Sequence, residues 1–203
     1  YDGAKRRIIQ KSFVSGVLDE TRHLYYTQPS QWQVVEERLG TSPDTADAER
    51  QFVWGHRYID DCILRARTVI DPLRERLYAL QDANWNVTSI VDDAGAVQER
   101  YTYTAYGVPL FLDATFVPDT PTKQWETLYC GYRRETATQL YHVRHRVYNS
   151  TLGTWVQRDP LGLAASVSLY CYVSSHPFVR LDPLGLEPVT VTCTFCETPI
   201  AKA

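Results

Sequence analysis

Two aspartates in a repeated pentapeptide are the residues of this chain that are best placed to do chemistry. Asp159-Pro160-Leu161-Gly162-Leu163 recurs as Asp182-Pro183-Leu184-Gly185-Leu186, and the two aspartates are 23 positions apart. The rigid Pro and the permissive Gly can hold each carboxylate in a fixed backbone frame. Two carboxylates brought together supply the acid and the base that a hydrolysis needs. The repeat therefore predicts Asp159 and Asp182 as a catalytic pair.

The same pentapeptide is also typical of a plain turn. Asp at the first position, Pro at the second and Gly at the fourth form a preferred type I β-turn. In that interpretation Pro160, Gly162, Pro183 and Gly185 are turn residues and the aspartates do no chemistry. Composition alone cannot bring the two side chains together, so the elements around them decide between the two interpretations.

Length, charge and hydropathy exclude several classes of protein. The 203 residues suffice for one domain or two small ones, and a net charge of -3 gives no basic surface for nucleic acid. No apolar run approaches the ~20 residues of a membrane-spanning helix. The chain holds no Met and begins without a signal-peptide pattern, so we expect a piece of a longer protein. We expect neither a nucleic-acid partner nor a membrane span.

Cofactor and metal motifs are also missing from the sequence. Cys193 and Cys196 form a single CxxC without the second ligand pair that a structural zinc site needs. The five histidines are scattered, and no Gly-rich phosphate loop occurs. We therefore expect no cofactor and no metal. The basic clusters at Arg133-Arg134 and at 144–146 are expected to pair with acidic turns.

The distribution of aromatic residues predicts β structure throughout. Fourteen Tyr and five Trp are spread along the chain, and such side chains prefer pleated, half-buried surfaces. Residues 77–106 read as three strands separated by turns at 83–86 and 92–95. Strands are also expected at 7–14, 24–26 and 33–39. A turn-rich segment is expected at 40–50, a Pro-rich loop at 107–126, and strands alternating with turns at 128–158. We expect a mainly all-β fold of antiparallel hairpins with little helix.

A recurring unit indicates that these hairpins stack. It consists of a Tyr, a turn with Asp and Gly, and a β-branched run, and degraded copies begin at Tyr1 and Tyr58. A single hairpin cannot bury its own apolar face, so repeats of this kind pack against their neighbours.

Together these motifs resemble the C-terminal region of Rhs/YD-repeat proteins, including the Rhs repeat-associated core domain, and the related toxin-complex C subunits. The specific matches are Tyr129-Cys130-Gly131-Tyr132, the run from Gly153 to Gly162, Leu169-Tyr170-Cys171-Tyr172-Val173 and the run from Asp182 to Leu186. The resemblance implies YD-repeat hairpins at 1–126, a core domain at 127–186 that closes a hollow β shell, and a short tail at 187–203.

The resemblance also implies an activity. Such a core domain is an aspartyl autoprotease, with Asp159 and Asp182 as catalytic residues, Arg158 in support and the cut between Leu186 and Glu187. The substrate is then the C-terminal segment of the same chain, and the partner is the rest of the parent shell. The parent protein is expected to be secreted or at the cell surface, with no delivery partner indicated.

Two positions depart from the family pattern. A Gly-Arg-Phe step is replaced by Gly153-Thr154-Trp155, and an Asn-Asn-Pro turn by Ser175-His176-Pro177. The alternatives to an autoprotease are an inert plug of the shell, a cell-surface β scaffold, or a recognition module that uses an aromatic face.

Overall fold

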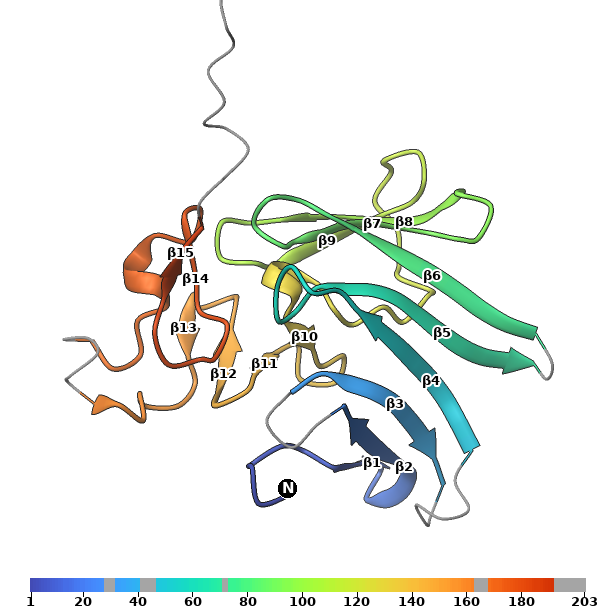
Figure 1. The fold of residues 1–203 in the computed structure, drawn as a ribbon, viewed down its shortest axis with the longest axis horizontal. Helices are drawn as coiled ribbons and strands as arrows, with labels where there is room; N and C mark the ends of the chain where they lie inside the picture. Colours follow the sequence, from blue (N-terminus) through green and yellow to red (C-terminus); the bar gives the residue numbers. More distant parts are fainter. Residues whose placement is uncertain (28–31, 41–46, 71–72, 163–167, 192–203) are drawn as a thin grey trace, which may run out of the picture.

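A nine-stranded antiparallel sheet forms the first part of the molecule. The computed structural model describes residues 1–27, 32–40, 47–70, 73–162 and 168–191. In this part each strand pairs with the next one in the sequence, and the sheet curves around an arc from β1 to β9 (Figure 1). The strands are β1 (Ile9–Val14), β2 (Val17–Tyr26), β3 (Val34–Leu39), β4 (Asp47–Trp54), β5 (Cys62–Ile70), β6 (Leu73–Gln81), β7 (Val87–Val91), β8 (Val97–Tyr103) and β9 (Pro109–Leu112).

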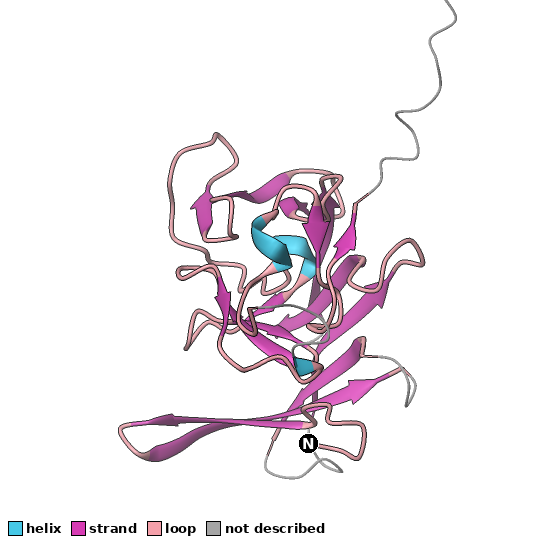
Figure 2. Ribbon diagram, turned by 90° about the vertical axis from the view of Figure 1, so that its left-hand side faces the viewer, coloured by secondary structure: helices cyan, strands magenta, loops and turns pink. Residues whose placement is uncertain are grey.

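Two smaller antiparallel sheets follow on the open side of this arc (Figure 1). The first contains β10 (Arg133–Arg134), β11 (Tyr141–Val143), β12 (Arg146–Asn149) and β13 (Thr154–Trp155), and the second contains β14 (Arg180–Leu181) and β15 (Val189–Thr190). Short 3-10 turns occur at η1 (Tyr129–Gly131) and η3 (Val173–Ser175). Figure 2 shows strands and loops in nearly all of the described chain and a long hairpin that extends beside the N-terminus. The predicted all-β, antiparallel fold with little helix is confirmed.

Aspartates fix the turns of the large sheet. At Asp2, Asp82, Asp92 and Asp113, Oδ1 accepts backbone N–H groups two and four residues further on, at 2.7–3.0 Å. Such Asx turns satisfy N–H groups that a hairpin bend leaves without a strand partner. The predicted strand–turn–strand pattern at 77–106 is confirmed, and its turns follow Asp82 and Asp92.

The expected loop at 107–126 was wrong at one place, because it contains β9. Pro109 opens this strand, and β9 lies at the edge of the nine-stranded sheet. A proline is tolerated there because it needs no N–H partner on the open side. The turn-rich segment at 40–50 was wrong at its end, since β4 begins at Asp47. Residues 41–46 lie outside the described part of the chain.

One apolar core joins the large sheet to the C-terminal elements. Buried side chains of β5 to β8 pack with Leu128, Trp155, Leu181 and a group of five tyrosines. The tyrosines are 129, 132, 141, 148 and 172, and the rings of Tyr148 and Tyr172 have centroids 4.2 Å apart. Because the core is continuous, the position of the C-terminal turns depends on the large sheet. The domain boundaries at 126 and 186 remain predictions.

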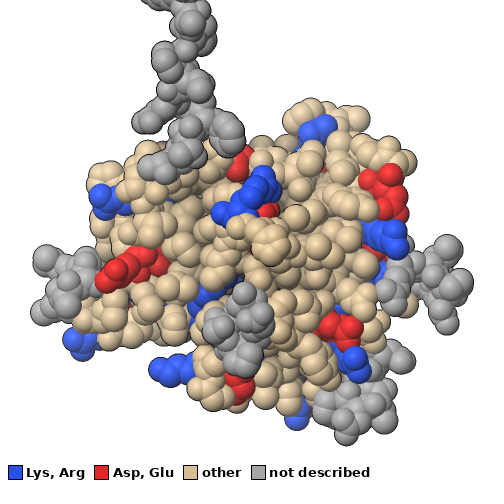
Figure 3. Space-filling view, viewed as in Figure 1, with Lys and Arg blue, Asp and Glu red and all other residues tan. Residues whose placement is uncertain are grey.

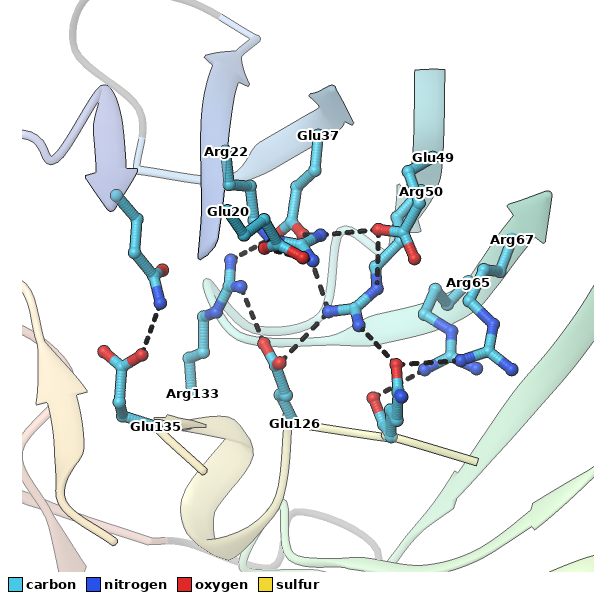
Figure 4. A network of polar contacts seen from close by, with 12 residues as sticks. Glu20, Arg22, Glu37, Glu49, Arg50, Arg65, Arg67, Glu126, Arg133 and Glu135 are labelled. Carbon is cyan, nitrogen blue, oxygen red and sulfur yellow. Dashed lines mark hydrogen bonds and ion pairs between the residues drawn. The ribbon is translucent and has the colours of Figure 1, made fainter. Parts of the chain in front are cut away.

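Buried ion pairs also link the two parts (Figure 4). Glu37 of β3 is fully buried and contacts Arg22, Arg50 and Arg133, of which Arg133 comes from β10. The second nitrogen of Arg133 lies 2.6 Å from Glu126. Burial alone would raise the pKa of Glu37, but the three arginines outweigh it and hold the pKa at about 2.

Charges of both signs are interspersed on the face shown in Figure 3. None of the helical turns in the described residues has the length and apolar character that crossing a bilayer requires.

Candidate active site

Both copies of the repeated pentapeptide form turns. The Gly162 N–H donates to the Asp159 carbonyl at 3.1 Å, and the Gly185 N–H donates to the Asp182 carbonyl at 3.3 Å. Both glycines have a φ of 67°, which side chains with a Cβ rarely adopt. Each motif therefore forms a turn, and this geometry leaves the chemical role of the two aspartates open. Both aspartate side chains are buried, so each turn also carries a carboxylate into the interior of the protein.

Arg146 joins the two aspartates. Its Nη1 lies 2.8 Å from Oδ2 of Asp159, and its Nη2 lies 3.0 Å from Oδ2 of Asp182. Each aspartate uses its other oxygen within its own turn, where Asp159 Oδ1 accepts the Leu161 N–H and Asp182 Oδ1 accepts the Leu186 N–H. One guanidinium thus fixes two carboxylates that are 23 positions apart in the sequence.

Strand alternation explains why Arg146 points inward. In β12 the side chains alternate: Arg146 and Tyr148 are buried, whereas Val147 and Asn149 are partly exposed. The Arg146 guanidinium carbon lies 4.2 Å from the centre of the Trp155 ring, which provides a cation–π contact. Trp155 stands where the family pattern has Phe, and in this chain its ring supports the arginine between the two acids.

Asp182 lies in the more closed environment of the two acids. The hydroxyl of Tyr132 bonds to both its N–H and its carbonyl, and its side chain is almost completely buried. Burial raises the pKa of Asp182, while the Leu186 N–H and Arg146 act against that rise. A carboxyl with a raised pKa is suited to hold a proton and to donate it.

The backbone of the second turn is bound on one side by residues 144–146. Three successive carbonyls accept hydrogen bonds from this segment: Pro183 from the Arg144 side chain, Leu184 from the His145 N–H at 3.2 Å, and Gly185 from Arg146 Nε at 2.5 Å. A Cβ on Gly185 would lie 2.6 Å from the Val143 carbonyl oxygen. The chain leading to Leu186 is therefore fixed at each residue.

The structure brings together Asp159, Asp182 and Leu186, while Glu187 is exposed. Arg158 is exposed, and the described ion pairs of both acids are with Arg146. Pairing of the basic segment 144–146 with acidic turns is confirmed, but the sequence interpretation did not single out Arg146. The sequence did contain a signal for Arg146. It lies two residues before Tyr148, and residues two apart on a strand point to the same face of the sheet, so a buried Tyr148 implies a buried Arg146.

A cavity borders this site. It has a volume of about 360 Å³, and Arg144, Arg146, Gln157 and Pro160 are among its lining residues. The space suffices for several water molecules next to the arginine between the two carboxylates. Among the described residues, no group of three or more His, Cys, Asp or Glu side chains could hold a metal ion. Cys193 and Cys196 lie outside the described part.

Comparisons with known proteins find similar sequences and similar structures. The chain is 40% identical over 58 residues to "Probable deoxyribonuclease RhsB" of Dickeya dadantii, which covers 29% of this chain. It is 29% identical over 108 residues to "tRNA3(Ser)-specific nuclease WapA" of Bacillus spizizenii, covering 51% of this chain. The crystal structure of TcdB2-TccC3 matches 92% of this chain with a TM-score of 0.68 at 21% identity. This chain is related to the C-terminal region of Rhs/YD-repeat proteins.

The Rhs-related chain is short compared with these proteins. It spans 4% of the length of each of the two curated relatives and 9% of the matched structure's chain. No family model matches it. The structural match shows that the chain shares its fold with part of the TcdB2-TccC3 structure over 92% of its length.

Proposed function

We propose that this chain is the shell-closing end of an Rhs-type toxin protein and that it cuts itself between Leu186 and Glu187. The observation that carries the proposal is the bridge of Arg146 between Asp159 and Asp182, with the Leu186 N–H bonded to Asp182 at 2.9 Å. This contact supports the proposal because it holds Leu186, the residue before the proposed cut, against a buried acid. The secreted or cell-surface location of the parent protein is part of the same proposal.

The reaction is a hydrolysis. Water from the cavity adds to the Leu186 carbonyl carbon and loses a proton to Asp159, which acts as the base. Asp182, with its raised pKa, donates a proton as the C–N bond breaks. The products are a carboxylate on Leu186 and an amine on Glu187. Arg146 holds the two acids in position by contacting Oδ2 of each.

Because the proposed substrate is part of the same chain, the site needs neither to bind a separate substrate nor to turn over more than once. The substrate is held by the three carbonyl contacts of residues 183–185, so no binding step precedes the reaction. Effective concentrations in such intramolecular reactions are large, and a single turnover suffices. The new N-terminal residues do not leave at once, because β15 of the downstream product still pairs with β14.

The test is the intact mass of the purified chain and of three variants. Asp159→Asn and Asp182→Asn each remove one acid, and Asp113→Asn changes a half-buried aspartate whose described hydrogen bonds lie within its own turn. We expect fragments that meet between Leu186 and Glu187 in the wild type and in Asp113→Asn, and a loss of at least about a hundredfold in the other two. Equal cleavage in all four proteins contradicts the proposal.

An inert plug is the second candidate. It is favoured by the full set of partners around the acids, since Oδ1 of each fixes its own turn and Oδ2 of each pairs with Arg146. In that case the uncut chain persists, and both Asn variants lower only its stability.

A further inference from the structure

A second aspartate–arginine pair contacts the same turn from the large sheet. Asp60 lies in the turn between β4 and β5 and is buried. Both of its oxygens pair with Arg144, Oδ1 with Nη2 at 2.5 Å and Oδ2 with Nη1 at 2.9 Å. Nη1 of Arg144 also donates to the Pro183 carbonyl. A single guanidinium therefore connects the turn of the large sheet with the turn before Leu186.

Both ends of this connection are closely packed. A Cβ on Gly131 would lie 2.6 Å from the Asp60 carbonyl oxygen, which also accepts the Cys62 N–H at 2.9 Å. Arg144 has a φ of 43° in the two-residue turn between β11 and β12, an uncommon conformation for a residue with a Cβ. The bidentate contact with Asp60 and the bond to Pro183 hold Arg144 in this conformation.

We propose that Asp60 is a positioning residue for the segment 182–187, acting through Arg144 on the Pro183 carbonyl. The inference rests on the proposed self-cleavage. In addition, cleavage depends on the large sheet. The turn before Leu186 reaches its fixed position only when the β4–β5 turn packs against it. Cleavage then follows completion of the sheet, and a chain whose sheet is incomplete stays uncut.

Removal of the Asp60 charge frees Arg144 to move. Arg144 lines the cavity, so an unpaired guanidinium has space to turn toward water instead of remaining buried without a partner. The next two residues, His145 and Arg146, donate the neighbouring bonds to the Leu184 and Gly185 carbonyls. A change at Arg144 is therefore passed on to the residues that hold Leu186 and Asp182.

Asp61 provides a matched control. It is also fully buried and ion-paired, but its partner is Arg57 at 2.8 Å, whose described contacts lie in the β4–β5 turn and on the Trp85 ring. Asp60→Asn and Asp61→Asn each remove one buried charge from the same turn. Only Asp60→Asn changes a pair that contacts the turn before Leu186.

The experiment measures two quantities in the full chain. The first is the rate at which Glu187 appears as a new N-terminus in Asp60→Asn, Asp61→Asn and wild type, well below the melting temperature of all three. The second is hydrogen exchange of the His145 and Leu186 amides in the same three proteins, each carrying Asp159→Asn to keep the chain uncut. We expect Asp60→Asn to slow cleavage about ten- to a hundredfold and to speed exchange at both amides at least about tenfold, and Asp61→Asn to change either by less than about twofold.

The two readouts separate the two claims. If the wild type is not cut but Asp60→Asn still speeds exchange selectively, the positioning role stands and the proposed self-cleavage fails. If the wild type is cut and Asp60→Asn behaves like Asp61→Asn in both readouts, the positioning role is overturned. Unchanged exchange in Asp60→Asn overturns it in either case.

Discussion

The Tyr132 hydroxyl takes the place of a backbone partner for Asp182. It accepts the Asp182 N–H and donates to the Asp182 carbonyl, and both bonds are 2.9 Å long. Tyr132 is buried in the tyrosine group of the core, so its ring is held by the neighbouring rings. The position of a proposed catalytic residue is thus fixed from the hydrophobic core.

Tyr132→Phe is expected to destabilise the fold by about 1–3 kcal/mol, because it leaves a buried N–H and a buried carbonyl of Asp182 without this partner. Urea unfolding measures the difference. Tyr170→Phe is the control, since Tyr170 is half exposed, and we expect a change within about 0.5 kcal/mol. Equal stability of the two variants would show that the hydroxyl of Tyr132 does not hold Asp182.

The two glycines of the repeat offer a matched pair of substitutions. Both have a φ of 67°, but a Cβ meets nothing within 4 Å at Gly162, whereas at Gly185 it lies 2.6 Å from the Val143 carbonyl oxygen. We expect Gly162→Ala to cost about 1 kcal/mol from backbone strain alone. Gly185→Ala is expected to cost at least twice as much and to slow cleavage. Equal thermal shifts in the two variants would contradict this packing of the second turn against β11.

Acid is expected to weaken the contact between the two parts of the molecule through Glu37. Its pKa is held at about 2, below the ordinary value of 4.5, so the ionised form stabilises the fold above pH 4.5. This contribution is lost as the pH falls from about 4.5 to about 2. Glu37→Gln should be less stable at pH 7 and lose less stability across that window. Parallel curves of unfolding free energy against pH for the two proteins would contradict the assignment.

The large sheet could be predicted from local patterns. Alternation of Tyr and β-branched residues at 97–103, with Asp-containing turns before them, indicates strands whose partners are their neighbours in sequence. The prediction failed at Pro109, where the prolines of the segment indicated a loop but the structure has strand β9. An edge strand tolerates a proline that a central strand would not.

The candidate site was predictable only in part. The repeat marked Asp159 and Asp182, and the family resemblance marked Leu186. The links between them are side-chain contacts across long sequence separations, such as Arg146 with both acids, Tyr132 with Asp182, and Arg144 with Asp60. Local pattern does not encode such contacts, although an inward-facing arginine on β12 requires an acidic partner.

The kinetics of the cut test the central claim most directly. The wild-type chain is synthesised in a reconstituted translation system that contains no protease, and the appearance of Glu187 as a new N-terminus is followed over a hundredfold dilution of the product. The account predicts this single cut, with a half-time that does not change on dilution, because acids and substrate belong to one folded chain. Absence of the Glu187 terminus, or a half-time that lengthens with dilution, would contradict it.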